Sequence, residues 1–155
     1  MMSSYKYLSA GLVALLLGSS QVLAADAPEV VELTQIPCQF IESENGVDHG
    51  YQSASADDCI AVNKSTGESR IQQAQELKLS PGNYIFRVTN KNVPYELGFW
   101  LRGAGVIGYA TLPSVSGGGL ALGKTQDYLI ELKAGEYVYS CPLNPTPDYH
   151  LSVSE

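Results

Sequence analysis

The sequence predicts an all-β fold, an antiparallel sandwich or barrel, with an irregular N-terminal region in front of it. Short runs of alternating apolar and polar residues recur from residue 76 onward, and Pro, Gly and Asn residues separate them. No stretch has the periodicity of a convincing long helix. The length fits one domain that buries roughly two-thirds of its unfolded surface.

Residues 1–24 are predicted to be a secretory signal peptide. Lys6 makes the start weakly positive, residues 8–18 are apolar, and Val22-Leu23-Ala24 matches a cleavage site of small residues. The apolar run is too short to span a membrane, and no cysteine near the cut could carry a lipid anchor. We therefore expect 131 of the 155 residues to be exported as a soluble chain, most simply to a bacterial periplasm.

The charge of the mature chain limits its partners. Lys6 is the only charged residue of the leader, so 8 basic and 16 acidic residues remain, a net charge of −8. This balance argues against nucleic acid and against anionic membranes, and we expect no membrane insertion. A cationic partner and simple solubility both fit it.

Residues 25–75 are expected to form an N-terminal extension with a first strand at Val30–Leu33 and a disulfide-stapled loop. The loop is rich in Ser, Asn, Asp and Gly and would order poorly without a staple. Pairing Cys38 with Cys59 closes a loop of about 21 residues, which the chain-entropy model values at roughly 3 kcal/mol. Cys141 is then a free thiol, although its pairing with either of the other two stays an alternative.

Residues 76–155 are expected to form the main part of the domain. A short helical turn precedes it over 68–75, and a glycine-rich connection with some strand character occupies 102–123. The alternating segments that predict strands are 77–79, 84–88, 95–101, 127–133, 137–141 and 151–155.

Known catalytic patterns do not fit this chain. Residues 118–125 match the phosphate-binding pattern G-x-x-x-x-G-K-T, but the residues that follow alternate as a strand where that mechanism needs a helix. Cys141 and His150 could form a thiolate–imidazolium pair, yet no oxyanion-hole element accompanies them. We expect that the chain is not an enzyme.

The segment that ends at Cys141 is the best candidate for chemistry. The period of two places Tyr137, Tyr139 and Cys141 on one face of a strand. Three prolines then stiffen the loop that leads to His150.

In its C-terminal half the chain resembles the cupredoxins, which are Greek-key β-sandwich proteins that hold a type 1 copper. The resemblance spans roughly residues 77–153. It depends on Leu-Ser-Pro-Gly-Asn-Tyr-Ile-Phe-Arg-Val-Thr-Asn over 79–90, on Pro94-Tyr95, and on Gly-Glu-Tyr-Val-Tyr-Ser-Cys over 135–141. It implies a cupredoxin-type sandwich and a copper held by one cysteine, two histidines and usually a weak methionine.

The ligand pattern implied by this resemblance is degenerate. Tyr95 stands where the first histidine is expected, Asn144 where the second is, and Tyr149 lies near the methionine position. Only Cys141 remains, although His150 lies close enough in sequence to substitute. The expected site therefore has Cys141 and His150 as ligands of copper or zinc, with Tyr95, Asn144 and Tyr149 lining a pocket.

Three hypotheses about function follow. The first is a periplasmic protein that handles copper or transfers one electron through an atypical site around Cys141. The second is a metal-free cupredoxin-fold module that binds a periplasmic protein or assists assembly. The third is a thiol redox role for Cys141.

Overall fold

The computed structural model describes residues 27–155, so the predicted signal peptide, residues 1–24, lies outside the described part of the chain. Across 27–155, no helix is long and apolar enough to cross a membrane.

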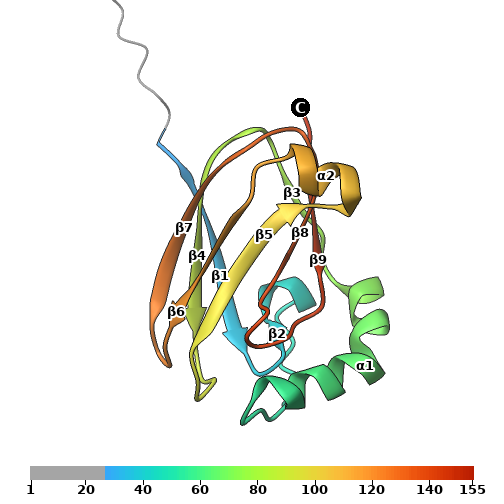
Figure 1. The fold of residues 1–155 in the computed structure, drawn as a ribbon, viewed down its shortest axis with the longest axis vertical. Helices are drawn as coiled ribbons and strands as arrows, with labels where there is room; N and C mark the ends of the chain where they lie inside the picture. The colour runs from blue at the N-terminus through green and yellow to red at the C-terminus, as the bar shows by residue number, and fades with distance from the viewer. Residues whose placement is uncertain (1–26) are drawn as a thin grey trace, which may run out of the picture.

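Two β-sheets pack face to face, which confirms the predicted β-sandwich (Figure 1). The sheets are mixed and not purely antiparallel, because β1 pairs with β4, and β3 with β9, in parallel. The four-stranded sheet has the order β2 (Gln39–Phe40), β1 (Glu29–Ile36), β4 (Gly82–Asn90) and β7 (Thr125–Leu132). The five-stranded sheet has the order β3 (Leu77–Leu79), β9 (Tyr149–Val153), β8 (Gly135–Ser140), β5 (Leu97–Gly103) and β6 (Val115–Leu120).

The core between the sheets is aromatic. Phe99 of β5 lies 5.6 Å from the ring of Phe86 and 5.1 Å from that of Tyr128, so both sheets meet at this residue. Tyr137 and Tyr139 are fully buried, and Cys141 follows them on the same inner face. The prediction that these three residues share one face is therefore confirmed.

The expectation that the chain has no long helix is wrong, because residues Ala56–Gln73 form the 18-residue helix α1. Ser55 and Asp58 form a capping box at its start. Only Cys59 and Arg70 of the helix are buried. The helix is thus fixed by its cap and two long-range anchors, and it lacks the apolar stripe that sequence periodicity detects. A short 3-10 helix, η1 (Glu42–Glu44), precedes it.

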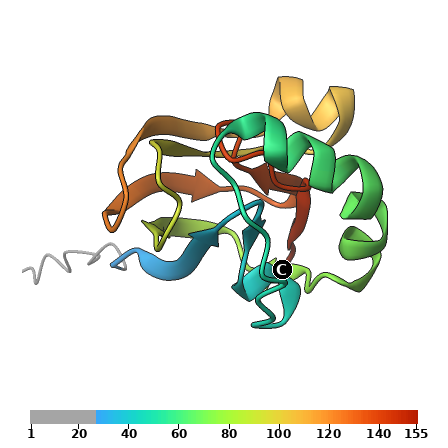
Figure 2. The ribbon, with the colours of Figure 1, turned by 90° about the horizontal axis from the view of Figure 1, so that it is seen from below.

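The connection expected over 102–123 contains a second helix, α2 (Gly105–Thr111), ahead of β6. Its backbone lies so close to β5 that a Cβ on Gly103 would be 2.1 Å from the carbonyl oxygen of Gly108. Viewed from below, α2 projects outward from the sandwich (Figure 2). Residues Thr125–Leu132 form strand β7, so the helix that a phosphate-binding loop requires is absent there.

Candidate functional site

The cysteines have the predicted arrangement. Cys38 and Cys59 form a disulfide, and Cys141 is a free, buried thiol. The disulfide joins the turn after β1 to the first part of α1. It therefore fixes the long N-terminal loop to the end of the sandwich at which Cys141 lies.

Cys141 follows the last residue of β8 and is enclosed by the chain. Its Sγ accepts hydrogen bonds from the backbone N–H groups of Gly98, at 3.4 Å, and Asn144, at 3.2 Å. Burial raises the pKa of the thiol above its usual value, although these hydrogen bonds oppose the rise. The thiol is therefore protonated at neutral pH and hidden from solvent, which disfavours the redox hypothesis.

Asn144 occupies the position at which the resemblance implies a second histidine. Its Oδ1 accepts a hydrogen bond from the N–H of Cys38 at 2.9 Å, and its Nδ2 donates to the carbonyl oxygen of Ile36 at 2.9 Å. The same Nδ2 lies 3.4 Å from Oε1 of Gln35, whose Nε2 donates to the carbonyl oxygen of Gly98. Both amides are fully buried. This network holds the disulfide loop, β1 and the Cys141 loop together.

The two tyrosines expected in the pocket lie in different surroundings. Tyr95 is half-buried, and its hydroxyl is hydrogen-bonded to that of Ser53. Burial raises its pKa, while that hydrogen bond opposes the rise. Tyr149 is fully buried and donates to Oε1 of Glu44, and burial and the carboxylate raise its pKa. Neither tyrosine is disposed to form the phenolate that a metal would bind.

His150 does not reach Cys141. Along β9 the side chains alternate, so Tyr149 and Leu151 point inward and His150 is exposed on the outer face. There it borders a shallow hollow at the end of α1, next to Ile71 and Glu76. The proposed pairing of Cys141 and His150 as metal ligands is therefore not formed in this structure.

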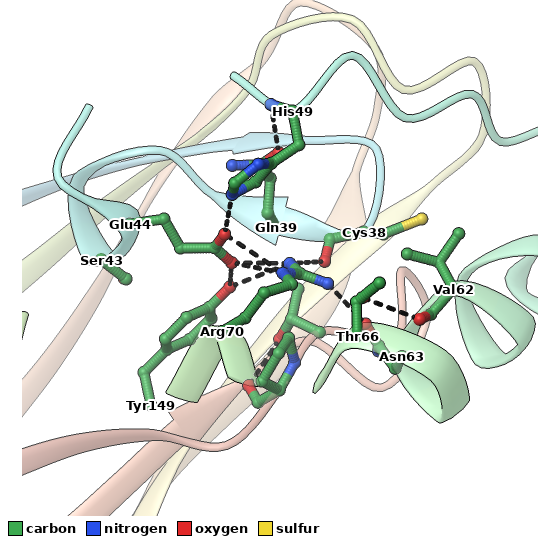
Figure 3. A network of polar contacts seen from close by, with 12 residues as sticks. Cys38, Gln39, Ser43, Glu44, His49, Val62, Asn63, Thr66, Arg70 and Tyr149 are labelled. Carbon is green, nitrogen blue, oxygen red and sulfur yellow. Dashed lines mark hydrogen bonds and ion pairs between the residues drawn. The ribbon is translucent and has the colours of Figure 1, made fainter. Parts of the chain in front are cut away.

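The other histidine, His49, belongs to a buried ionic cluster that sequence reasoning missed (Figure 3). Its Nε2 lies 2.7 Å from Oε2 of Glu44, and Arg70 contacts Oε1 of the same carboxylate at 2.6 Å. Arg70 also donates to the carbonyl oxygen of Cys38 at 2.8 Å and to Oδ1 of Asn63 at 2.8 Å. The only sequence signal was one arginine in a polar segment, and it does not point to a partner 26 residues earlier.

This cluster has a structural role. Burial alone would lower the pKa of Arg70, but the hydrogen bond and attraction of Glu44 outweigh it and the pKa is raised. Arg70 therefore stays charged, and its donors connect α1 to η1 and to the disulfide turn. Tyr149, which also contacts Glu44, extends the connection to β9.

The residues present do not fit a type 1 copper. Such a site needs a thiolate, two imidazoles and a weak axial ligand. Around Cys141 the candidate neighbours are the hydrogen-bonded amides of Asn144 and Gln35. In the part of the chain covered by residues 27–155, no three His, Cys, Asp or Glu side chains are grouped to hold a metal ion.

The comparisons with known proteins establish the fold. No family model matches the sequence, and no curated protein matches it. Auracyanin B is similar in structure, with a TM-score of 0.52 and 14% identity over 89% of this chain and 97% of that chain. The reduced auracyanin from the photosynthetic bacterium Roseiflexus castenholzii has a TM-score of 0.50 and 9% identity over 84% and 100% of the two chains. These neighbours are cupredoxins, so the cupredoxin-like fold predicted from the sequence is confirmed.

Proposed function

We propose that this chain is an exported, periplasmic cupredoxin-fold protein that binds protein surfaces, holds no type 1 copper and is not an enzyme. The observation that supports this most is the state of Asn144. Its amide is saturated by buried backbone groups at the position where the fold would otherwise present a histidine to the metal.

Reopening a metal site here has an energetic cost. A metal beside Cys141 would displace Asn144 from the N–H of Cys38 and the carbonyl oxygen of Ile36, which are buried. Each group left without a partner costs about 1–3 kcal/mol. The hydrogen-bonded arrangement is thus the stable state of this end of the sandwich.

A surface that suits a protein partner lies beside the Cys141 loop. A hollow of about 350 Å³ is lined by Gly98, Gly118, Trp100 and the Pro142–Leu143 segment, among other residues. An interaction module should expose an apolar patch around Tyr95, Trp100 and the Pro-rich loop, and the hollow includes the last two of these. The first, Tyr95, is instead bonded to Ser53.

One observation favours the competing hypothesis, copper handling through Cys141. Its sulfur accepts two backbone N–H hydrogen bonds, and such bonds stabilise a thiolate ligand. A copper held there would depend on this single thiolate and on atoms that the present arrangement does not supply.

A copper titration separates the two hypotheses. The mature protein, made without added metal and with Cys141 reduced, is titrated with Cu(II) under visible absorption and with Cu(I) against a chelator. We expect weak binding, equal in the wild type and in Cys141→Ser. One tightly bound copper per chain that Cys141→Ser abolishes would overturn the proposal in favour of copper handling.

A further inference from the structure

The helix α2 exposes its apolar side chains instead of burying them. Val106, Ile107 and Tyr109 are 88%, 80% and 63% exposed, and no residue of the helix is buried. The helix lies against β5 through the glycine backbone contact described above, and these three side chains remain largely exposed to solvent. They form an apolar projection, which we call the knob.

The knob and the Trp100 hollow lie on the same outer face of the five-stranded sheet. Strand β5 runs from the hollow at Gly98 to Gly103, and α2 follows at its end (Figure 1). At about 3.3 Å per residue, roughly 16 Å of strand lies between Gly98 and Gly103. The rings of Trp100 and Tyr109 are in edge contact at 6.4 Å, which makes the surface between them continuous.

This surface carries little net charge on a strongly acidic chain. Residues 103–123 contain no charged side chain. Arg102 lies over the ring of Trp100 at 3.9 Å and forms a 2.8 Å ion pair with Asp148, so its charge is balanced locally. The exposed carboxylate of Glu96 borders the hollow, where its Oε1 accepts a hydrogen bond from the N–H of Gly119, so the apolar contact forms beside one negative charge per copy.

We infer that this face binds a second copy of the chain in a two-fold dimer, with the knob of each copy seated in the hollow of the other. A two-fold interface requires that one surface carries both complementary parts, which is the arrangement along β5. This inference rests on the proposed interaction role and is independent of whether copper binds.

The available apolar area is small for a stable dimer. Six apolar side chains contribute, which are Trp100, Val106, Ile107, Tyr109, Pro142 and Leu143. At about 100 Å² each they bury on the order of 600 Å² per copy, below the roughly 800 Å² of a standard interface. We therefore expect a reversible dimer with a Kd in roughly the micromolar range.

Sedimentation of the mature, disulfide-bonded protein from about 1 to 200 µM tests the inference. We expect Ile107→Glu, at the knob, and Leu143→Glu, at the hollow, each to raise the Kd at least about tenfold. Leu129→Glu is the matched control, because Leu129 is 65% exposed on β7 of the other sheet. It should leave the Kd unchanged, and circular dichroism checks that all three variants fold.

An equimolar mixture of Ile107→Glu and Leu143→Glu tests the reciprocal geometry. The first variant keeps an intact hollow and the second an intact knob, so the mixture restores one of the two contacts and should dimerise better than either variant alone. A protein that stays monomeric at every concentration, open-ended polymers, or a dimer that Ile107→Glu leaves intact would overturn the inference. The two experiments fail separately. A protein that sediments as a monomer and does not bind copper would overturn only the dimer. A protein that binds one copper tightly through Cys141 would overturn only the proposed function.

Discussion

Replacing Arg70 by methionine should strongly destabilise the fold. The guanidinium is buried and donates to Glu44, to the carbonyl oxygen of Cys38 and to Asn63, and methionine replaces none of these bonds. Removing one member of a buried ion pair typically costs 3–5 kcal/mol, because the other charge stays buried without its partner. His49 and Tyr149 still contact the Glu44 carboxylate in this variant. We therefore expect the unfolding free energy to fall by about 3 kcal/mol, at the low end of that range.

Equilibrium urea unfolding with the disulfide intact measures this loss directly. In a thermal melt, about 3 kcal/mol corresponds to a decrease of roughly 10 °C in Tm for a domain of this size. Arg87→Met is the matched control, because Arg87 forms a similar two-bond contact with Asp127 on the exposed face of the four-stranded sheet. Exposed pairs contribute little, so this variant should unfold like the wild type.

A second substitution tests the assigned cause. If the buried charge of Glu44 produces the loss, Glu44→Gln should restore part of the stability in the Arg70→Met background. Equal midpoints for Arg70→Met and Arg87→Met would refute the reasoning. So would a double variant less stable than Arg70→Met alone, because packing and not charge would then explain the effect.

Three further predictions concern the Cys141 end and α2. Asn144→Ala should lower the unfolding free energy by about 2–3 kcal/mol, measured in urea, because two buried backbone groups lose their partner; an unchanged midpoint would contradict the proposed role of the amide. Burial raises the pKa of Cys141, so its contribution to stability is complete below the pKa of the unfolded thiol and is lost as the pH rises through the folded pKa. A thiol reagent should therefore label the native protein slowly at neutral pH, and Cys141→Ala should reduce the loss of stability in alkaline solution; rapid native labelling would show the thiol to be accessible. Gly103→Ala should cost about 1–3 kcal/mol, since its Cβ would meet the carbonyl oxygen of Gly108, while Gly118→Ala should be tolerated; equal melting temperatures would contradict the close contact.

Local patterns in the sequence predicted most of the strands and the fold. The alternation at Tyr84, Phe86 and Val88, and again at Tyr137 and Tyr139, marks side chains that the structure buries. Alternation is visible without coordinates because one face of each strand contacts the core. The Cys38–Cys59 disulfide was predictable for a similar reason, since a polar loop of that length needs a staple.

The helices were missed because their stability is not local. The anchors of α1 are a disulfide and the contact between Arg70 and Glu44, which no periodicity encodes. The helix α2 depends on the close approach of the Gly103 and Gly108 backbones. From composition alone, this glycine-rich segment was predicted to be a connecting loop. In both cases long-range contacts decide the conformation.

At the candidate site, too, some features follow from the sequence and others only from the tertiary structure. The resemblance of the sequence to cupredoxins implied that only Cys141 of a copper-type ligand set remains, and that Asn144 stands where a histidine is expected. Only the tertiary structure decided that His150 points outward, because the orientation of a strand residue depends on register against its neighbours. Only the fold brings Asn144 to Ile36 and Cys38, which are more than 100 residues earlier in the chain. Its amide therefore forms buried hydrogen bonds with their backbone groups.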